Sequence, residues 1–352
     1  MTEILKVDPI NPEINIIRKA ADIIRKGGLV VFPTETVYGL GADAFNENAV
    51  RKVFEAKNRP LGNPLIVHLA DKSQVELVAK DIPDEVYEIA DKVWPGPLTL
   101  ILMKRENVPK IVTGGLSTVA VRIPAHPVAL SLIKEAGRPI VGPSANISGR
   151  PSPTRPEHVI KDLFNRVDII LDAGETFHGV ESTIIDLTKD PPALIRPGPI
   201  TIEDLRELLG RDVLVPPEIH GKISERTEFT TPSFRYPRYV PKTKLVLVEG
   251  ELNDVIRIVS SLAKKAIAKG KKVALIVSDE TKECYKDIKG DLFVVGSRKN
   301  LFSIAKNLFN ILRRVEDANV DLAIAEGYDL KGIGFTIMNR LRNAAHEIVK
   351  PD

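Results

Sequence analysis

Apolar residues recur along the chain in two patterns, and the last third of the sequence shows the simpler one. Short apolar runs at 245–249, 272–277, 291–295 and 320–325 are typical of buried parallel strands. Helical patterns fill the intervals and follow the last run, at 252–269, 279–287, 298–316 and 334–348. This regular alternation predicts a smaller, Rossmann-like parallel α/β domain.

The first two thirds of the chain alternate less regularly. An amphipathic helix is expected over 15–26, because the pattern stops at Gly27-Gly28, and a second helix over 47–57. The expected strands are 29–32, 64–69, 98–103, 118–123, 139–141, 168–172, 182–187 and 193–196. This mixture predicts a twisted mixed α/β sheet, with polar loops at the strand ends where such folds place their ligand sites.

The prolines indicate how the chain divides. Of 26 prolines, all but Pro351 precede Lys244, and a cluster of them falls between Pro216 and Pro241. We therefore expect one domain over 1–215, a proline-rich linker or lid over 216–244, and a second domain over 245–352. Aromatic and basic side chains interleave in the middle segment, which favours a lid over a passive tether. They are Phe229, Phe234, Tyr236, Tyr239, Arg226, Arg235 and Arg238.

Composition narrows the class of protein. The 352 residues carry a net charge of +3, too balanced for a general nucleic-acid coat. Cys284 is the only cysteine, which excludes an intramolecular disulfide and a cysteine-based zinc site. No apolar run reaches the ~18 residues of a membrane span and no secretory signal is visible, so we expect a cytoplasmic protein. A single glutamine and 28% charged residues favour a thermophilic source.

Candidate chemistry lies in the polar loops. The loop 142–149 lacks the Gly-Lys-[Ser/Thr] of a Walker loop, but its hydroxyl and amide donors could still cradle phosphates. Lys57 and Arg59, expected on a polar loop, could either complete a helix C-terminus or face an anion. Arg122 lies inside an apolar strand, where it needs either an acidic side chain or an anionic ligand as partner. His68, taken alone, is better explained as a core histidine.

The order of these motifs along the chain resembles the YrdC family. The matching segments are Pro33-Thr34-Glu35-Thr36-Val37-Tyr38-Gly39-Leu40, Lys57-x-Arg59-Pro60 with Asn63-Pro64-Leu65, Trp94-Pro95-Gly96-Pro97-Leu98-Thr99, Val119-Ala120-Val121-Arg122-Ile123-Pro124, Ser144-Ala145-Asn146-Ile147-Ser148-Gly149, Ser182-Thr183 and Ile195-Arg196-Pro197-Gly198. Gly332-Ile333-Gly334, Ile337 and Asn339-Arg340-Leu341 resemble the extra C-terminal domain of the family's two-domain members. The segment 231–239 departs from the family's usual pattern, which leaves the contacts of Phe234 and Arg238 open.

This resemblance implies a fold and an activity. The fold is a twisted α/β sheet with a concave, basic cavity. The activity is the condensation of L-threonine, bicarbonate or CO2, and ATP into threonylcarbamoyl-adenylate and pyrophosphate, a nucleotidyl transfer. A partner transferase would then pass the threonylcarbamoyl group to an adenosine of tRNA. Mg2+ is expected to arrive with the ATP phosphates, without a metal site of the protein's own.

The resemblance also implies roles for individual residues. Lys57, Arg59, Ser144 and Asn146 would act on the reacting phosphates. The other ATP contacts would come from Asn63, Thr118, Ser152, Arg196 and Phe234, together with Arg59 and Ser144. L-Threonine would be held by Thr36, His68, Arg122, Gly142 and Ser182, with the planar fork of Arg122 pairing with its carboxylate.

Two other classes of function stay open. A YrdC-like carbamoyltransferase would normally carry zinc-finger and acylphosphatase-like modules, and a single cysteine cannot build the former. A non-catalytic RNA-binding protein would need a basic face with exposed aromatic residues. The near-neutral net charge and the 5% aromatic content make that class less favoured, and they give no strong signal for direct nucleic-acid binding.

Overall fold

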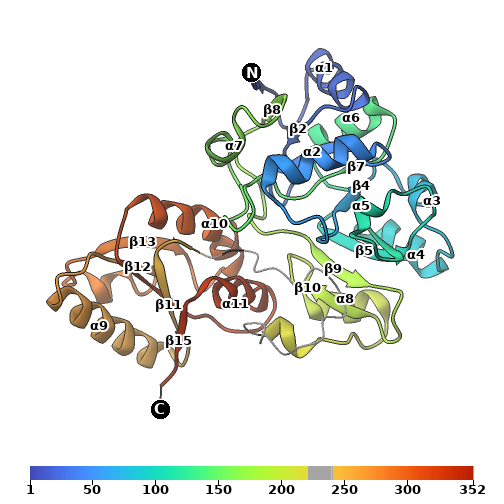
Figure 1. Ribbon diagram of the computed structural model, residues 1–352. Coiled ribbons are helices and arrows are strands. Elements are labelled where there is room, and N and C mark those ends of the chain that lie inside the picture. The colour runs from blue at the N-terminus through green and yellow to red at the C-terminus, as the bar shows by residue number, and fades with distance from the viewer. Residues whose placement is uncertain (221–238, 240, 352) are drawn as a thin grey trace. The chain divides into compact units, whose positions relative to one another are not determined.

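The computed structural model describes residues 1–220, 239 and 241–351 (Figure 1). These residues form two compact units, one built from 1–148 and 152–219 and the other from 149–151, 220, 239 and 241–351. No helix in the described ranges is both long and apolar enough to cross a membrane. Of the proposed lid, residues 221–238 and 240, including Phe234 and Arg238, lie outside the described residues. Tyr239 is described and is buried.

The first unit is built on a mixed sheet, as predicted. In the described residues the sheet has ten strands, in the order β1-β8-β2-β3-β7-β4-β6-β5-β9-β10. The strands are β1 (Glu3–Lys6), β2 (Val30–Phe32), β3 (Gly39–Asp43), β4 (Ile66–His68), β5 (Leu98–Met103), β6 (Thr118–Arg122), β7 (Ile140–Val141), β8 (Ile169–Asp172), β9 (Thr183–Asp186) and β10 (Ala193–Arg196). The sheet contains both parallel pairs, such as β4–β6, and antiparallel pairs, such as β4–β7.

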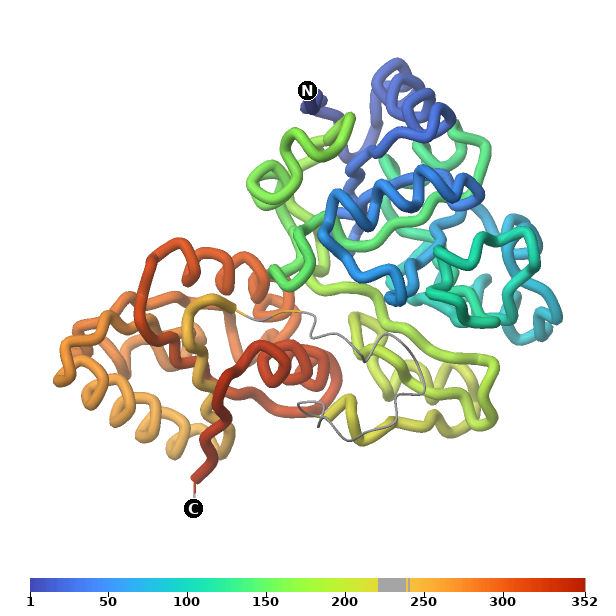
Figure 2. The backbone as a smooth tube through the Cα atoms, viewed as in Figure 1, coloured from blue at the N-terminus to red at the C-terminus, as the bar shows by residue number. Residues whose placement is uncertain are grey.

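Residues far apart in sequence lie side by side in this sheet. Strand β1 pairs in parallel with β8, so the dark blue N-terminus lies beside the green segment near residue 170 (Figure 2). The Thr2 hydroxyl, which is buried, donates to the main-chain oxygen of Val167. This first strand is absent from the sequence-based prediction, because 3–6 is short and carries two charged residues.

Helices α1 (Ile14–Arg25) and α6 (Pro127–Ala136) pack on each other and on one face of the sheet. In α1 the buried residues are Ile17, Ala20, Ala21 and Ile24, the spacing of one helical face. The other helical segments of this unit are η1 (Lys72–Gln74), α2 (Glu47–Lys57), α3 (Val75–Val78), α4 (Asp84–Val93), α5 (Lys110–Thr113), α7 (Pro156–Leu163), α8 (Ile202–Leu209) and η2 (Pro217–His220). Together they confirm an α/β architecture for this unit.

Strand β3 is absent from the strands expected from the sequence. A Cβ on either Gly39 or Gly41 would lie 3.0 Å from a ring atom of Phe32, so glycine is needed for the strands to approach. Two glycines in five residues weaken any sequence signal for a strand, although their absent side chains are what permits this one.

The second unit is an all-parallel sheet flanked by helices. In the described residues its order is β13-β12-β14-β11-β15, and the prediction of a smaller parallel α/β domain is confirmed. The strands are β11 (Lys244–Val248), β12 (Val273–Ser278), β13 (Asp291–Gly296), β14 (Leu322–Glu326) and β15 (Glu347–Val349). The helices are α9 (Leu252–Ala268), α10 (Leu301–Asp317) and α11 (Ile333–Ala344). The apolar face of α9 packs on alternate residues of β11, β12 and β14.

Two predicted helices in this unit are wrong. The segment 279–287 forms only the short 3-10 helix η4 (Lys282–Tyr285). The last helix ends at Ala344 instead of continuing to 348, because Ala345 is extended and the chain turns into β15. His346 fixes this turn: its main-chain N–H donates to Leu245 O, and its Nδ1 accepts from Leu245 N.

Candidate active site

Arg122, the last residue of β6, is the centre of the site in the first unit. The residue is 3% exposed, and its Nε donates to Gly96 O at 3.1 Å. Its Nη1 donates to the Thr36 hydroxyl at 2.9 Å, and its Nη2 lies 2.6 Å from Glu35 Oε1. The buried arginine therefore has the acidic partner that its position in an apolar strand requires. The sequence-based assignment gave Glu35 no role, although the need for that partner was the signal that could have found it.

His68 lies beside Arg122 because of the strand register. The two are aligned partners in the parallel pair β4–β6, and the imidazole makes an edge contact with the Phe32 ring. A Cβ on Gly142 would lie 2.6 Å from His68 Nδ1, so glycine lets the ring lie against the main chain that follows β7. Burial, and then the charge of Arg122, lower the pKa of His68 to about 3. The imidazole is therefore neutral at pH 7.

Ser182, the residue just before β9, joins this group. Its hydroxyl lies 2.8 Å from the Thr99 hydroxyl and accepts from Arg196 Nη2 at 2.9 Å. Arg196 Nε also donates to the main-chain oxygen of Ser182 at 2.8 Å. The charge of Arg196 contributes to the lowered pKa of His68. The structure thus brings together Thr36, His68, Arg122 and Gly142, with Ser182 just before β9 and Arg196 at the end of β10.

Lys57 does not lie on a polar loop, and that expectation is wrong. It is the last residue of α2, which ends there because Asn58 adopts a left-handed conformation. Its side chain is 1% exposed, and Nζ donates to the main-chain oxygens of Ser144 and Asn146. Ser148 N donates in return to Lys57 O at 2.8 Å. Burial, and then the charge of Arg59, hold the pKa of Lys57 well below its usual range.

The loop 142–149 lies against the segment 33–41 as well as against α2. Leu40 N donates to Pro143 O, and Ala145 N donates to Tyr38 O. This places half-buried Ser144 opposite Gly39. Arg59 and Asn63 form a second turn, in which Arg59 Nε donates to Asn63 O at 3.3 Å and Nη2 to Pro64 O at 3.0 Å. Of the side chains expected at the phosphates, Arg59, Ser144 and Asn146 therefore come from two loops next to α2, and Lys57 comes from the end of α2 itself.

Thr118 and Ser152 are less closely tied to these groups. Thr118 begins β6, four residues before Arg122, which corresponds to about 13 Å along the strand. Ser152 is buried, and its hydroxyl donates to Glu181 Oε1 at 2.7 Å. Phe234 lies outside the described residues. The roles of these three in binding ATP stay predictions.

A cluster of three or more metal-ligating side chains is not found in the described part of the chain. A buried cation beside a buried carboxylate, with a neutral imidazole and hydroxyl groups around them, suits a small zwitterionic ligand with polar substituents. The loops at α2 carry hydroxyls and a guanidinium, which suit an anionic group.

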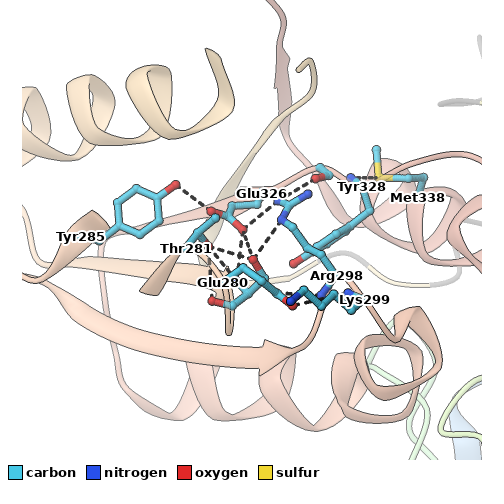
Figure 3. A network of polar contacts seen from close by, with 10 residues as sticks. Glu280, Thr281, Tyr285, Arg298, Lys299, Glu326, Tyr328 and Met338 are labelled. Atoms are coloured by element: carbon cyan, nitrogen blue, oxygen red, sulfur yellow. Dashed lines mark hydrogen bonds and ion pairs between the residues drawn. The ribbon is translucent and has the colours of Figure 1, made fainter. Parts of the chain in front are cut away.

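A second polar cluster lies in the other unit, at the carboxyl ends of β12 and β14 (Figure 3). Glu326 is fully buried, and it accepts from Tyr285 OH at 2.7 Å, from Ser278 N at 3.1 Å and from Arg298 Nη2 at 2.9 Å. The Arg298 guanidinium also lies over the ring of Tyr328. Because both carboxylate oxygens have donors inside the cluster, we interpret it as internal support for the strand ends.

Two known family models match this chain, one over the part that carries the candidate active site and one over most of the rest. The Sua5/YciO/YrdC family model, described as "Telomere recombination", matches residues 22–198. A second model, "Threonylcarbamoyl-AMP synthase, C-terminal domain", matches residues 200–346. The chain belongs to the Sua5/YciO/YrdC family. The resemblance inferred from the sequence motifs is thereby confirmed, including the second domain of the two-domain members.

Relatives in this family match along nearly the whole chain. The "Threonylcarbamoyl-AMP synthase" of Pyrococcus abyssi is 47% identical over 95% of this chain and 95% of its own length. The protein of the same name from Bacillus subtilis is 41% identical over 94% and 92%. The crystal structure of P. abyssi Sua5 complexed with L-threonine matches with a TM-score of 0.93 and 45% identity, covering 100% of both chains. Escherichia coli YciO, with a TM-score of 0.52 and 28% identity, covers 56% of this chain, as a single-domain family member would.

Proposed function

We propose that this chain is a threonylcarbamoyl-AMP synthase, a nucleotidyltransferase that condenses L-threonine, bicarbonate or CO2, and ATP. The products are threonylcarbamoyl-AMP, pyrophosphate and water. The proposal rests on one observation above all: a chain with this site is matched along its whole length by a Sua5 structure that contains L-threonine. Two named synthases at 47% and 41% identity support the same activity.

Arg122, Thr36 and His68 form the proposed amino-acid pocket. The carboxylate of threonine would pair with the Arg122 guanidinium, and its hydroxyl would meet the polar groups of His68 and Ser182. A pocket of this kind should select threonine over apolar analogues, because a missing hydroxyl would leave buried polar groups unpaired. Gly142 matters for its lack of a side chain, since a Cβ there would displace the imidazole.

The loops at the end of α2 form the proposed phosphate site. In the reaction an oxygen of the threonylcarbamate attacks the α-phosphorus of ATP, and pyrophosphate leaves. Two anions meet in this step, so fixed donors and cations are needed to stabilise the transition state. Arg59 and the groups of Ser144 and Asn146 would contact the phosphates directly. Lys57 would act mainly by holding that loop, because its Nζ donates to two main-chain oxygens of the loop.

Mg2+ is part of the proposed substrate, since ATP carries it on its phosphates. Asn63, Thr118, Ser152, Arg196 and Phe234 complete the proposed contacts to ATP. We also propose that the product passes to a tRNA-modifying transferase in the cytoplasm. The match of residues 200–346 to a synthase C-terminal domain favours this function over a carbamoyltransferase or a non-catalytic RNA-binding protein.

Threonine-dependent release of pyrophosphate tests the proposal. Purified protein is mixed with ATP, Mg2+ and bicarbonate, with L-threonine or with L-valine, and the adenylate is identified by mass spectrometry. We expect pyrophosphate and a threonylcarbamoyl-adenylate only with threonine. The Arg122→Lys variant, which retains the charge but not the planar fork, should lose most of this activity. Pyrophosphate release that is independent of threonine would contradict the proposal.

A further inference from the structure

Glu35 is a buried carboxylate that the proposed pocket has not yet used. It is 6% exposed, and its Oε1 lies 2.6 Å from Arg122 Nη2. Among the described residues, neither oxygen of Glu35 accepts a hydrogen bond, and Arg122 Nη2 donates none. A buried carboxylate whose oxygens accept no hydrogen bond beyond the ion pair with Arg122 is costly, so the arrangement calls for a donor that the described residues do not supply.

The charges around Glu35 come from three elements. Arg122 faces it from β6, His126 from the start of α6 and His178 from the loop before β9. Burial lowers the pKa of both histidines, against the opposing effect of Glu35, so both are neutral at pH 7. Among the described residues, the positive charge in contact with Glu35 is therefore that of Arg122, which already uses Nε and Nη1 elsewhere.

An α-amino acid is complementary to this pair. The carboxylate and ammonium of an α-amino acid are attached to the same carbon, so the two charges lie a few ångströms apart. The guanidinium of Arg122 and the carboxylate of Glu35 are separated by a similar distance. Of the five N–H groups of an arginine, Arg122 uses one for Gly96 and one for Thr36, which leaves one on Nη1 and two on Nη2. A ligand whose carboxylate takes these N–H groups brings its ammonium within reach of the vacant acceptors of Glu35.

We propose that Glu35 is a further catalytic residue, which binds the ammonium of threonine and takes the proton that must leave before the nitrogen can react. This inference rests on the proposed function. An α-ammonium is mainly protonated at pH 7 and has no lone pair with which to attack carbon. Transfer of one proton from nitrogen to Glu35 provides that lone pair in a buried site.

The step balances with bicarbonate as co-substrate. The amine nitrogen forms the C–N bond to the carbon of bicarbonate, and one C–O bond of bicarbonate breaks, so that water leaves. In sum, the threonine ammonium and bicarbonate give the threonylcarbamate, water and one proton, and that proton is the one held on Glu35. It passes to solvent after the product leaves. No oxidant or reductant is needed.

The pH profile of Glu35→Gln tests the proposal. At saturating bicarbonate, kcat/KM for threonine in the wild type should vary little between pH 6.5 and 8.5. In Glu35→Gln it should fall by about 10²–10⁴-fold at pH 7. It should then rise about tenfold per pH unit, because this variant depends on the small fraction of threonine that is already deprotonated. Glu35→Asp retains a carboxylate, so it should be slower than the wild type but keep the flat profile.

Asp43→Asn is the matched control. Asp43 is another buried carboxylate of the same sheet, and it lies 2.6 Å from Arg138 Nη1 at the opposite end of β3 from Gly39. This variant should lose stability but keep the wild-type pH profile. A slow Glu35→Gln with a flat profile would overturn the proposal, because Glu35 would then only position Arg122.

A binding measurement on the wild type covers the case in which Glu35→Gln fails to fold. A threonine analogue with a hydroxyl in place of the ammonium should bind at least 100-fold more weakly in calorimetry, and equal affinity would overturn the proposal. The two hypotheses fail in different ways. Absence of threonine-dependent pyrophosphate release from the wild type refutes the proposed function. An active wild type whose Glu35→Gln variant shares its profile refutes the role of Glu35 alone.

Discussion

The Nζ of Lys57 donates to the main-chain oxygen of Asn146 at 2.6 Å, and through this contact the end of α2 holds the loop 144–148 in place. Lys57→Met would leave two buried carbonyl groups without their donor, at a cost of about 1–3 kcal/mol. We expect a thermal midpoint lower by roughly 2–10 °C, together with a large loss of activity. Lys52→Met, at a more exposed position on the same helix, removes one hydrogen bond to Gly27 O and is the control, which should lower the midpoint less. An unchanged midpoint in Lys57→Met would show that the loop does not depend on this contact.

Arg59 should behave differently from Lys57, because it is only half-buried and donates two hydrogen bonds within its own turn. Arg59→Ala should weaken the binding of a non-hydrolysable ATP analogue at least tenfold, with little change in thermal midpoint. Arg51→Ala removes an exposed arginine of α2 that pairs with Glu47, and it should leave ATP binding unchanged. Calorimetry on both variants measures the difference, and equal ATP affinity would remove Arg59 from the site.

His68 predicts a pH dependence of stability with a definite sign. The pKa of His68 is about 3 in the folded protein, against about 6.5 when unfolded. Between these values the unfolded chain binds a proton that the folded chain does not. The free energy of unfolding should therefore rise with pH, by up to about 1.4 kcal/mol per unit for this residue, and level off above pH 6.5.

Urea unfolding between pH 4 and 8 measures this slope in the wild type and in His68→Gln. The variant should be less dependent on pH, with the remaining slope coming from groups such as His126 and His178. Parallel curves for the two proteins would mean that His68 is not the buried neutral group described.

Ser182 should contribute to recognition of the threonine hydroxyl. Its own hydroxyl lies between the Thr99 hydroxyl and Arg196 Nη2. In the wild type, threonine should bind at least 100-fold more tightly than valine, whereas Ser182→Ala should narrow this ratio severalfold. Competition calorimetry with threonine, serine and valine provides the measurement. A ratio near one in the wild type would contradict a site that recognises the hydroxyl group.

Glu326 should matter for stability and not for the reaction. Glu326→Gln removes the charge that pairs with Arg298, whose side chain is 19% exposed. We expect the opening free energy of this sheet to fall by roughly 2–4 kcal/mol, below the value for a fully buried pair. Faster hydrogen exchange of the β12 and β14 amides would report the change. Glu283→Gln, on the exposed side of η4, should leave exchange unaltered.

Helices and strands could be predicted where the local hydrophobic periodicity alone determines them. Helix α9 and strand β5 have clear periodicity, and their observed bounds differ little from those expected. Strand β15 could not be predicted, because three residues after a helix carry no pattern and their place depends on pairing with β11. The same holds for β3, whose glycines are explained only by the Phe32 ring against which they pack.

The site divides in the same way. Motifs indicated Arg122, His68 and Gly142, and the register of β4, β6 and β7 brings them together. The direction in which each side chain points, and the groups it contacts, were less predictable. Lys57 points into the protein because the loop 144–148 supplies carbonyl acceptors there, a contact between residues almost 90 positions apart. Glu35 became a candidate only once its distance to Arg122 and its vacant oxygens were known.

The alignment of His68 with Arg122 in the parallel pair β4–β6 has a practical consequence for handling the protein. A slip of one residue in this register would put Val67 or Leu69 beside the guanidinium, and it would also turn the apolar side chains of β4 to the wrong face. A misregistered sheet could still melt cooperatively, yet it would have no amino-acid pocket. The fraction of molecules that bind threonine in a titration therefore counts the correctly paired sheets in a preparation, a quality that a thermal midpoint does not report.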